Sequence, residues 1–154
     1  KEYSQSDIKL LRDRRNDRYF EMLCNGNLLI EGVRETLAAL HNRFTMGIVT
    51  SSRKSHFMAA HRDSGILGYF SFTLTREDYT NSKPDPEPYL RGLRLAGASA
   101  DESMVIEDSE RGLQAADAAG IRCVVIPNGL TVDGDFSGAF KILKSIKELP
   151  GILA

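Results

Sequence analysis

The 154-residue chain carries 20 Lys and Arg residues against 21 Asp and Glu residues, so its net charge is −1. Its composition, 42% hydrophobic and 27% charged, is typical of a globular domain that is long enough to bury a core. This balance gives no basic field that would favour nucleic acid or an anionic membrane as a partner.

The cellular location is predicted from two features. The sequence has no signal-peptide pattern and no apolar run of membrane-spanning length. Its two cysteines, Cys24 and Cys123, are far apart and form no CxxC motif, which favours reduced thiols over a disulfide. We therefore expect a cytoplasmic protein with no membrane partner.

The first 25 residues have the pattern of a highly charged helix. Ile8, Leu11, Phe20 and Leu23 predict an apolar stripe along it. Basic and acidic residues alternate on the rest of its surface, which favours a solvated face with local ion pairs over a phosphate-binding patch. The character of the chain changes near residue 30, so we expect a boundary between a helical piece, residues 1–30, and a second unit, residues 31–154.

Strand and helix patterns alternate from residue 31 onward. Strands are predicted at residues 44–50, 70–74, 103–107 and 121–126, with a weaker one at 140–143. Helices are predicted from Glu31-Gly32, at 53–62, 87–96 and 109–119, with a last turn at 146–149. The nearly continuous apolar run of residues 46–49 is typical of a strand covered on both faces. The alternation predicts an α/β fold with a doubly wound parallel sheet.

Three polar segments follow elements of this sheet. The first, Thr50-Ser51-Ser52, comes directly after an apolar strand, where hydroxyl and backbone N–H groups suit a phosphate oxygen. Serine and threonine are also common helix caps, so capping is the favoured interpretation of this segment taken alone.

The second polar segment is Lys83-Pro84-Asp85-Pro86, in which the prolines stiffen the loop. A lysine held there can neutralise a phosphate or a developing negative charge. For an isolated lysine, a solvated turn residue is the simpler interpretation, and Asp85 is more simply a turn or cap residue than a catalyst.

The third segment is Glu107-Asp108-Ser109, which follows the apolar run Met104-Val105-Ile106. Capping by Asp108 or Ser109 would explain one polar residue but not two adjacent acids at a strand end. Ligands bind at that edge of open α/β sheets, and carboxylates there suit Mg²⁺. We therefore expect Glu107 and Asp108 to form a Mg²⁺ site.

The order of the three segments resembles the haloacid dehalogenase-like hydrolase superfamily over residues 30–150. The resemblance rests on Ile-Val-Thr-Ser-Ser, then Ser-Lys-Pro-Asp-Pro, then Val-Ile-Glu-Asp-Ser with a helix rich in Gly and Ala after it. Within the superfamily, the chain is most similar to the β-phosphoglucomutase and phosphoglycolate-phosphatase subgroup. The resemblance implies a Rossmann-like core, with residues 1–25 as the last part of a helical cap.

The resemblance also implies a reaction and its residues. Thr50 would bind the transferring phosphoryl group, with Ser51 and Ser52 beside it, and Lys83 would stabilise its charge. Asp108 would bind Mg²⁺, with Glu107 as a second ligand or a holder of water. The implied reaction is hydrolysis of a small phosphorylated metabolite through an aspartyl-phosphate intermediate.

The sequence departs from the family at its first motif, an Asp-x-Asp that ends the first strand and supplies the nucleophile. No strand pattern precedes residue 30, and the nearest acids, Asp13 and Asp17, lie in the charged helix. Without that strand, the sheet would have two unpaired inner edges. Three interpretations are open: an amino-terminal segment of the natural protein is lacking, another chain supplies the strand, or the core is rearranged. We favour the first and expect the 154 residues alone to be inactive.

Other functions are open as well. A phosphomutase fits the same resemblance, and a catalytically inactive relative that acts as a binding module fits the missing nucleophile. A response-regulator receiver domain is disfavoured, because its acid pair comes early in the chain and its Lys-Pro comes last. The phosphate ester and the oligomeric state cannot be read from the sequence.

Overall fold

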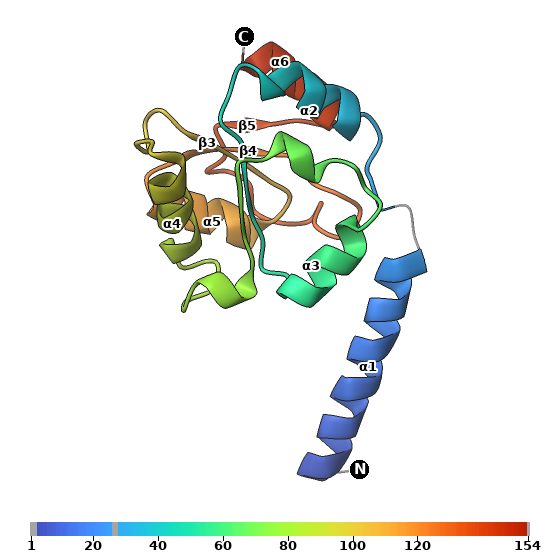
Figure 1. The fold of residues 1–154 in the computed structure, drawn as a ribbon. Helices are drawn as coiled ribbons and strands as arrows, with labels where there is room; N and C mark the ends of the chain where they lie inside the picture. Colours follow the sequence, from blue (N-terminus) through green and yellow to red (C-terminus); the bar gives the residue numbers. More distant parts are fainter. Residues whose placement is uncertain (1–2, 26–27, 154) are drawn as a thin grey trace.

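The structure is a computed structural model that describes residues 3–25 and 28–153 (Figure 1). Its helices are α1 (Gln5–Asn25), α2 (Val33–His41), α3 (Lys54–His61), α4 (Glu87–Ala96), α5 (Glu110–Ala118) and α6 (Leu149–Ile152). Its strands are β1 (Gly47–Val49), β2 (Phe72–Leu74), β3 (Met104–Glu107), β4 (Arg122–Val125) and β5 (Lys141–Ile142). Short 3₁₀ turns occupy Leu67–Tyr69, Arg76–Asp78 and Ile146–Glu148. Every predicted strand is present, although each is shorter than its apolar pattern.

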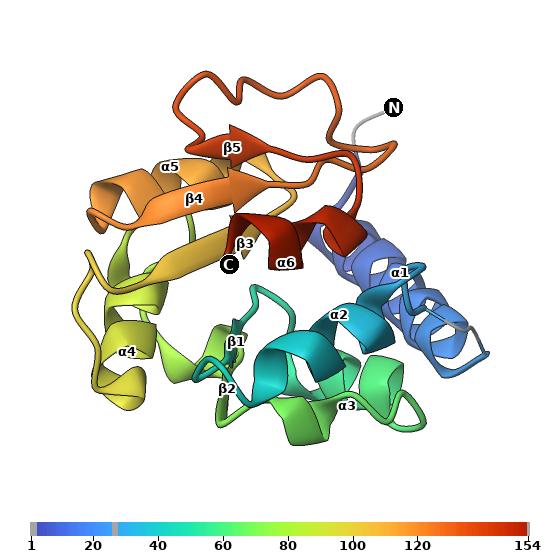
Figure 2. The same cartoon turned by 90° about the horizontal axis from the view of Figure 1, so that it is seen from above.

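The strands form two separate parallel sheets, which Figure 2 shows from above. In one sheet β1 pairs with β2, so that Ile48 lies opposite Thr73. In the other, the order is β3-β4-β5, and Val105 lies opposite Cys123. Within the described residues, β1 and β3 do not pair with each other. The parallel α/β architecture is therefore confirmed. The sheet is divided between β1 and β3, which is where the family's first strand would pair.

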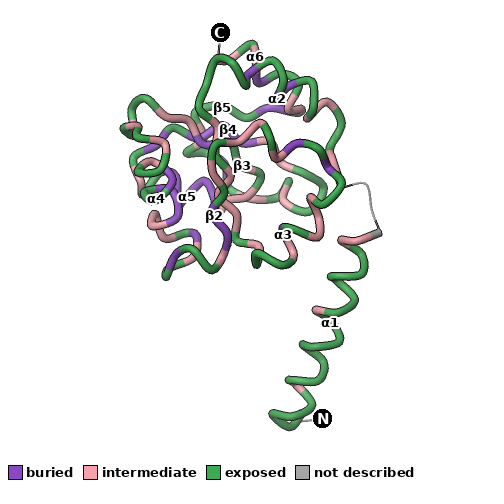
Figure 3. The backbone as a smooth tube through the Cα atoms, in the orientation of Figure 1, coloured by how far each residue is buried: buried purple, intermediate pink, exposed green. Residues whose placement is uncertain are grey.

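The three-stranded sheet is covered on both faces, as a doubly wound fold requires. Side chains alternate along β4: Cys123 and Val125 join a core with Ala115 of α5, whereas Val124 packs with Leu40 of α2 and with α6. The helices accordingly lie in layers, with α2 and α6 above the sheet in Figure 1 and α4 and α5 below it. Figure 3 shows buried residues in the body of the molecule and none over residues 3–24 of the N-terminal segment.

The expectation that the strand at residues 44–50 is covered on both faces is wrong for β1. Gly47 is exposed, and Ile48 and Val49 are only half-buried. The reason is that β1 has β2 as its single strand partner within the described residues, so its other edge lacks a neighbour. On β3, the side chain of Ile106 is likewise 38% exposed, although it sits in an apolar run.

Helix α1 extends away from the body of the molecule and meets it at α3 (Figures 1 and 3). The rings of Tyr19 and His56 make this contact edge to face, with centroids 5.2 Å apart. The predicted apolar stripe is largely uncovered, since Leu11 is 51% and Phe20 is 41% exposed. Of the helices in residues 3–25 and 28–153, none is both long and apolar enough to span a membrane.

Both cysteines are free thiols. Cys123 of β4 is buried in the core with Ala115 of α5, and burial raises its pKa to about 12. Its thiol is therefore protonated at neutral pH, as expected of a reduced core cysteine. Cys24 is half-buried near the end of α1.

Candidate functional site

Lys83 joins the ends of the two sheets. Its Nζ donates hydrogen bonds to the carbonyl oxygen of Val49, 3.1 Å away, and to Oε1 of Glu107, 2.5 Å away. Val49 is the last residue of β1 and Glu107 the last of β3, so the ammonium group lies between the carboxyl ends of these strands. The three polar segments singled out in the sequence therefore meet at one edge.

Lys83 is buried, with 8% of its surface exposed, so the interpretation as a solvated turn lysine is wrong. Its loop is fixed at both ends. The Glu87 carboxylate accepts the backbone N–H groups of Thr80 and Asn81 at 3.0 and 2.7 Å, and Arg111 of α5 donates to the carbonyl oxygen of Lys83. Asp85 accepts the N–H of Glu87, as expected of a turn residue.

Glu107 is held by donors on both carboxylate oxygens. Lys83 and the Tyr89 hydroxyl donate to Oε1, while the Ser109 hydroxyl donates to Oε2 at 3.0 Å. The N–H of Asp108 also points to Oε2, at 3.2 Å. Burial would raise the pKa of Glu107, but the Lys83 ammonium and these hydrogen bonds outweigh it, so the pKa lies below its usual value. Glu107 is therefore a charged, fully bonded carboxylate.

Tyr89 of α4 is a part of the site that the sequence did not reveal. Its hydroxyl donates to Glu107, and the Nζ of Lys83 lies 4.5 Å from its ring centroid, within the range of a cation–π contact. Burial and the adjacent Glu107 charge raise the pKa of Tyr89, so it stays protonated and acts as a donor. The predicted helix at residues 87–96 contained this tyrosine, but no role was predicted for it.

Gly112 is required by the position of the Glu107 carboxyl group. A Cβ atom built on Gly112 would overlap the carboxyl group of Glu107, so only glycine lets α5 approach the end of β3 this closely. Helix α5 begins after Ser109, whose hydroxyl accepts the N–H of Gly112 at 3.2 Å. Capping by Ser109 is thus confirmed, and it leaves Asp108 free of that role.

Asp108 differs from Glu107 in being exposed. Its Oδ2 accepts a hydrogen bond from the Asn128 amide at 2.7 Å. Partial burial and the neighbouring Glu107 charge raise the pKa of Asp108, so a cation beside it would stabilise the ionised form. An exposed carboxylate at a strand end, backed by a second negative charge, has the donor chemistry that suits Mg²⁺.

Thr50, Ser51 and Ser52 do not cap α3, so the capping interpretation is wrong. The N-cap residue of α3 is Arg53, which makes no side-chain cap bond, and the N–H of Lys54 is instead satisfied by Glu77. The Thr50 hydroxyl accepts the N–H of Ser52 at 3.1 Å in a tight turn. The turn holds these hydroxyl groups directly after β1.

The only Asp-x-Asp in the sequence is Asp133-Gly134-Asp135, and it does not end a strand. It lies in the exposed turn between β4 and β5, where Asp135 accepts the N–H of Ser137 at 2.9 Å. Within residues 3–25 and 28–153, no group of three or more His, Cys, Asp or Glu side chains is arranged to hold a metal ion.

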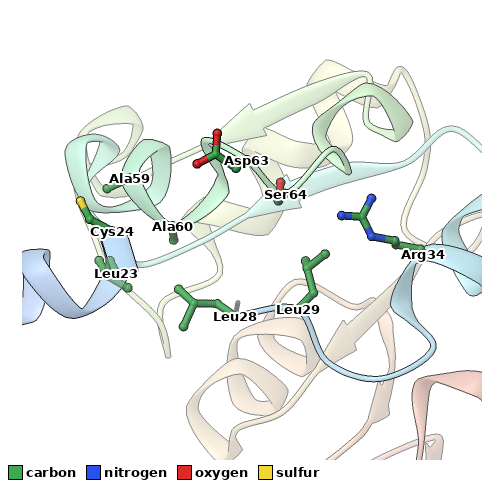
Figure 4. A pocket seen from close by; sticks show the side chains of 9 residues that line it. All are labelled: Leu23, Cys24, Leu28, Leu29, Arg34, Ala59, Ala60, Asp63 and Ser64. Carbon is green, nitrogen blue, oxygen red and sulfur yellow. The ribbon is translucent and has the colours of Figure 1, made fainter. Parts of the chain in front are cut away.

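A cavity of about 310 Å³ lies apart from these residues (Figure 4). Side chains from the end of α1, the following segment, α2, α3 and the turn after α3 line it, among them Cys24, Arg34 and Asp63. None of the residues around Lys83 belongs to its wall. The polar cluster at the strand ends, rather than this cavity, has the groups for chemistry.

Comparison with known families agrees with this geometry. The family model described as haloacid dehalogenase-like hydrolase matches residues 2–126, which is most of the chain. The matched range contains Thr50, Lys83 and the Glu107-Asp108 pair.

Curated relatives are also similar in sequence. A phosphoglycolate phosphatase of Salmonella typhi is 32% identical over 128 residues, covering 82% of this chain and 50% of the relative. Protein CbbY of Rhodobacter capsulatus is 30% identical over 141 residues, covering 87% of this chain and 62% of the relative. The chain thus spans between half and two thirds of the length of these relatives.

Solved structures share the fold. A predicted phosphoglycolate phosphatase from Haemophilus somnus superimposes with a TM-score of 0.91 at 24% identity, over 100% of this chain and 70% of that one. CbbY from Rhodobacter sphaeroides, solved in complex with xylulose-(1,5)bisphosphate, superimposes with a TM-score of 0.84 at 25% identity, over 96% of this chain and 68% of that one.

Proposed function

The chain belongs to the haloacid dehalogenase-like hydrolase family, and we propose that it supplies most of the active site of a Mg²⁺-dependent phosphatase of small phosphorylated metabolites. The nucleophile would be an aspartate on a strand that the 154 residues do not contain. A phosphatase and a CbbY protein among its relatives support a phosphate ester as the substrate.

One observation carries this proposal: Lys83 bridges the ends of β1 and β3. Its ammonium group lies between the Val49 carbonyl oxygen and the Glu107 carboxylate, next to Thr50 on one side and Asp108 on the other. A buried cation between hydroxyl groups and carboxylates is what a dianionic phosphate needs in order to approach an anionic nucleophile.

Each residue would have a separate role. Thr50 would donate its hydroxyl to the transferring phosphoryl group, with Ser51 and Ser52 contributing hydroxyl or N–H groups. Lys83 would offset the charge on the phosphoryl oxygens and on the nucleophile. Asp108 would bind Mg²⁺. Glu107 would position Lys83 and the Asp108 backbone through its hydrogen bonds to both. Bound Mg²⁺ would neutralise phosphoryl charge and orient the ester.

The reaction would have two steps. The aspartate oxygen attacks phosphorus and the ester P–O bond breaks, while a neighbouring acid gives a proton to the leaving alcohol. Water then attacks the acyl phosphate and releases inorganic phosphate and the free carboxylate. Lys83 would keep its hydrogen bond to Glu107 through both steps.

The arrangement of the elements supports a division of the chain into a cap and a core, and a position for the missing strand between β1 and β3. We assign residues 1–30 to a helical cap and residues 31–154 to the core, because α1 stands away from the body and contacts it at α3. An Asp-x-Asp strand would pair with β1 on one side and β3 on the other, and it would cover Ile106. The protein would work in the cytoplasm as a reduced enzyme.

The proposal is tested by hydrolysis of p-nitrophenyl phosphate with added Mg²⁺. The 154-residue chain should show no turnover, and the same chain with an upstream Asp-x-Asp strand should show it. Replacing both aspartates of the added strand by asparagine is the matched control.

Three other outcomes would overturn the proposal. Turnover by the 154-residue chain itself, abolished in Asp108→Ala, would mean that the nucleophile lies within these residues. No turnover after the strand is added would favour an inactive binding module. Transfer of phosphate to a second hydroxyl of a sugar, instead of to water, would identify a phosphomutase.

A further inference from the structure

Tyr79 is a buried tyrosine that the proposed reaction does not use. It follows β2 and precedes the Lys83 loop, and only 4% of its surface is exposed. Its hydroxyl donates a hydrogen bond to the carbonyl oxygen of Thr50, 2.9 Å away. Among the described residues, no second donor reaches this carbonyl oxygen. Tyr79 therefore satisfies the backbone of Thr50 directly after β1 ends.

Two neighbours of Tyr79 hold the next part of the same turn. The N–H of Arg76 donates to the carbonyl oxygen of Ser52 at 2.9 Å. The Glu77 carboxylate accepts the N–H of Lys54, also at 2.9 Å. Together with the Tyr79 bond, these contacts fix the turn after β1 at every second residue. All of them come from one short segment that follows β2.

That segment is itself fixed, so it can act as a support. The Asp78 carboxylate accepts the N–H and the hydroxyl of Thr75 at 2.7 and 2.8 Å, which closes a capping box around the 3₁₀ turn. The Arg76 guanidinium donates to the carbonyl oxygen of Tyr79 at 2.8 Å and lies 5.4 Å from the centroid of its ring. The direction of the Tyr79 hydroxyl is thus set by its own surroundings.

The Thr50 hydroxyl keeps one bonding function open. Its oxygen accepts the N–H of Ser52 at 3.1 Å, while the N–H of Thr50 donates to the carbonyl oxygen of Leu74 at 2.9 Å. A threonine hydroxyl is also a donor, and no group within residues 3–25 and 28–153 accepts its hydrogen. Thr50 is half-buried rather than enclosed, so this hydrogen can be offered to a ligand.

We propose that Tyr79 is a positioning residue for phosphoryl transfer: by holding the Thr50 carbonyl, it sets the direction of the Thr50 hydroxyl. This inference rests on the proposed function, in which Thr50 donates to the transferring phosphoryl group. Tyr79 acts through Thr50 and does not contact the phosphate. A donor that is aimed at the transition state contributes to kcat more than to KM, and a displacement of about 1 Å costs up to about 100-fold in rate.

The first test is Tyr79→Phe in the chain extended by an Asp-x-Asp strand, with p-nitrophenyl phosphate and Mg²⁺. This variant keeps the buried ring and removes only the hydroxyl. We expect kcat to fall about tenfold and KM to change by less than about twofold. The matched control is Tyr69→Phe, because Tyr69 precedes β2 and packs against His41 instead. Its kcat should stay within about twofold of the parent.

A second background separates positioning from a general loss of structure. Because Tyr79 acts through Thr50, the effect of Tyr79→Phe should shrink to less than about twofold in the Thr50→Val variant. The same loss of kcat in both backgrounds would overturn the inference. So would a loss confined to KM, a loss as large in Tyr69→Phe, or no loss in the parent.

Failure of the proposed function would look different, because an extended parent without turnover would refute phosphoryl transfer at Thr50 for every variant alike. Amide hydrogen exchange of the 154-residue chain tests the bond without activity. Tyr79→Phe should speed exchange of the Ser52 N–H, which the Thr50 hydroxyl accepts, by about tenfold. The N–H of Ile126, bonded to Glu107 in the other sheet, should exchange as before. Unchanged exchange at Ser52, or equal acceleration at Ile126, would overturn the positioning role.

Discussion

The Lys83–Glu107 ion pair makes the sharpest prediction about how the site is held together. Their side chains are only 10% and 9% exposed, and the charged atoms are 2.5 Å apart. Lys83→Met would leave the Glu107 carboxylate charged and buried, with only Tyr89 and Ser109 as side-chain donors. Breaking a buried pair in this way costs about 3–5 kcal/mol of unfolding free energy.

The double variant Lys83→Met/Glu107→Gln separates the pair from its parts. It removes both charges, so no uncompensated ion stays in the core, and the amide oxygen introduced by Glu107→Gln can still accept from Tyr89. The double variant should therefore lose less stability than the sum of the single variants, with a coupling energy of about 2 kcal/mol. Urea unfolding followed by circular dichroism measures the stability of the two single variants and of the double variant. The control is Lys147→Met, at the exposed Lys147–Glu31 pair.

Additive losses in this cycle would mean that Lys83 and Glu107 do not share one buried charge pair. The control should shift the unfolding midpoint much less than Lys83→Met, since water already solvates both of its partners. A control loss as large as that of Lys83→Met would equally contradict the assigned burial.

Three further predictions concern the surroundings of this pair. Tyr89→Phe removes a donor to charged Glu107 and should cost about 1.5–3 kcal/mol in urea unfolding; no loss would mean that the hydroxyl does not bond there. Gly112→Ala should destabilise by about 1–3 kcal/mol, against its helix propensity, because the added methyl overlaps Glu107; a gain would refute this. Hydrogen bonds from the Thr80 and Asn81 backbones lower the pKa of Glu87 from 4.5. The ionised Glu87 carboxylate therefore stabilises the fold above pH 4.5, and this contribution is lost as the pH falls through the lowered pKa. Wild type and Glu87→Gln should therefore differ in melting temperature at pH 7 and converge in acid, whereas a constant difference would argue against the bonds.

The sequence was sufficient to predict the parallel α/β architecture because apolar strands and helical periods alternate without interruption after residue 31. The lengths of the strands were overestimated because an apolar run does not show where backbone pairing stops. Residues 44–50 look like a central strand, yet β1 pairs over Gly47–Val49 alone, on a single edge. Burial of a strand depends on neighbours that its own pattern does not contain.

The polar segments of the site were visible in the sequence, but their supports were not. Lys83 and Glu107 are 24 residues apart, and only the sheet brings them together. Tyr89 and Arg111 have the spacing of ordinary helix residues, so no local pattern marked them. Thr50-Ser51-Ser52 looked like a cap because capping is a local property, whereas the site is formed by contacts between distant segments.

Asp108 and Lys83 are proposed to serve phosphoryl transfer to an aspartate held between β1 and β3. The most direct measurement is kcat/KM for p-nitrophenyl phosphate in the chain extended by an Asp-x-Asp strand, with Mg²⁺ or with EDTA. We expect activity that disappears in EDTA and falls at least about 100-fold in Asp108→Ala. Activity that survives both EDTA and Asp108→Ala would contradict it.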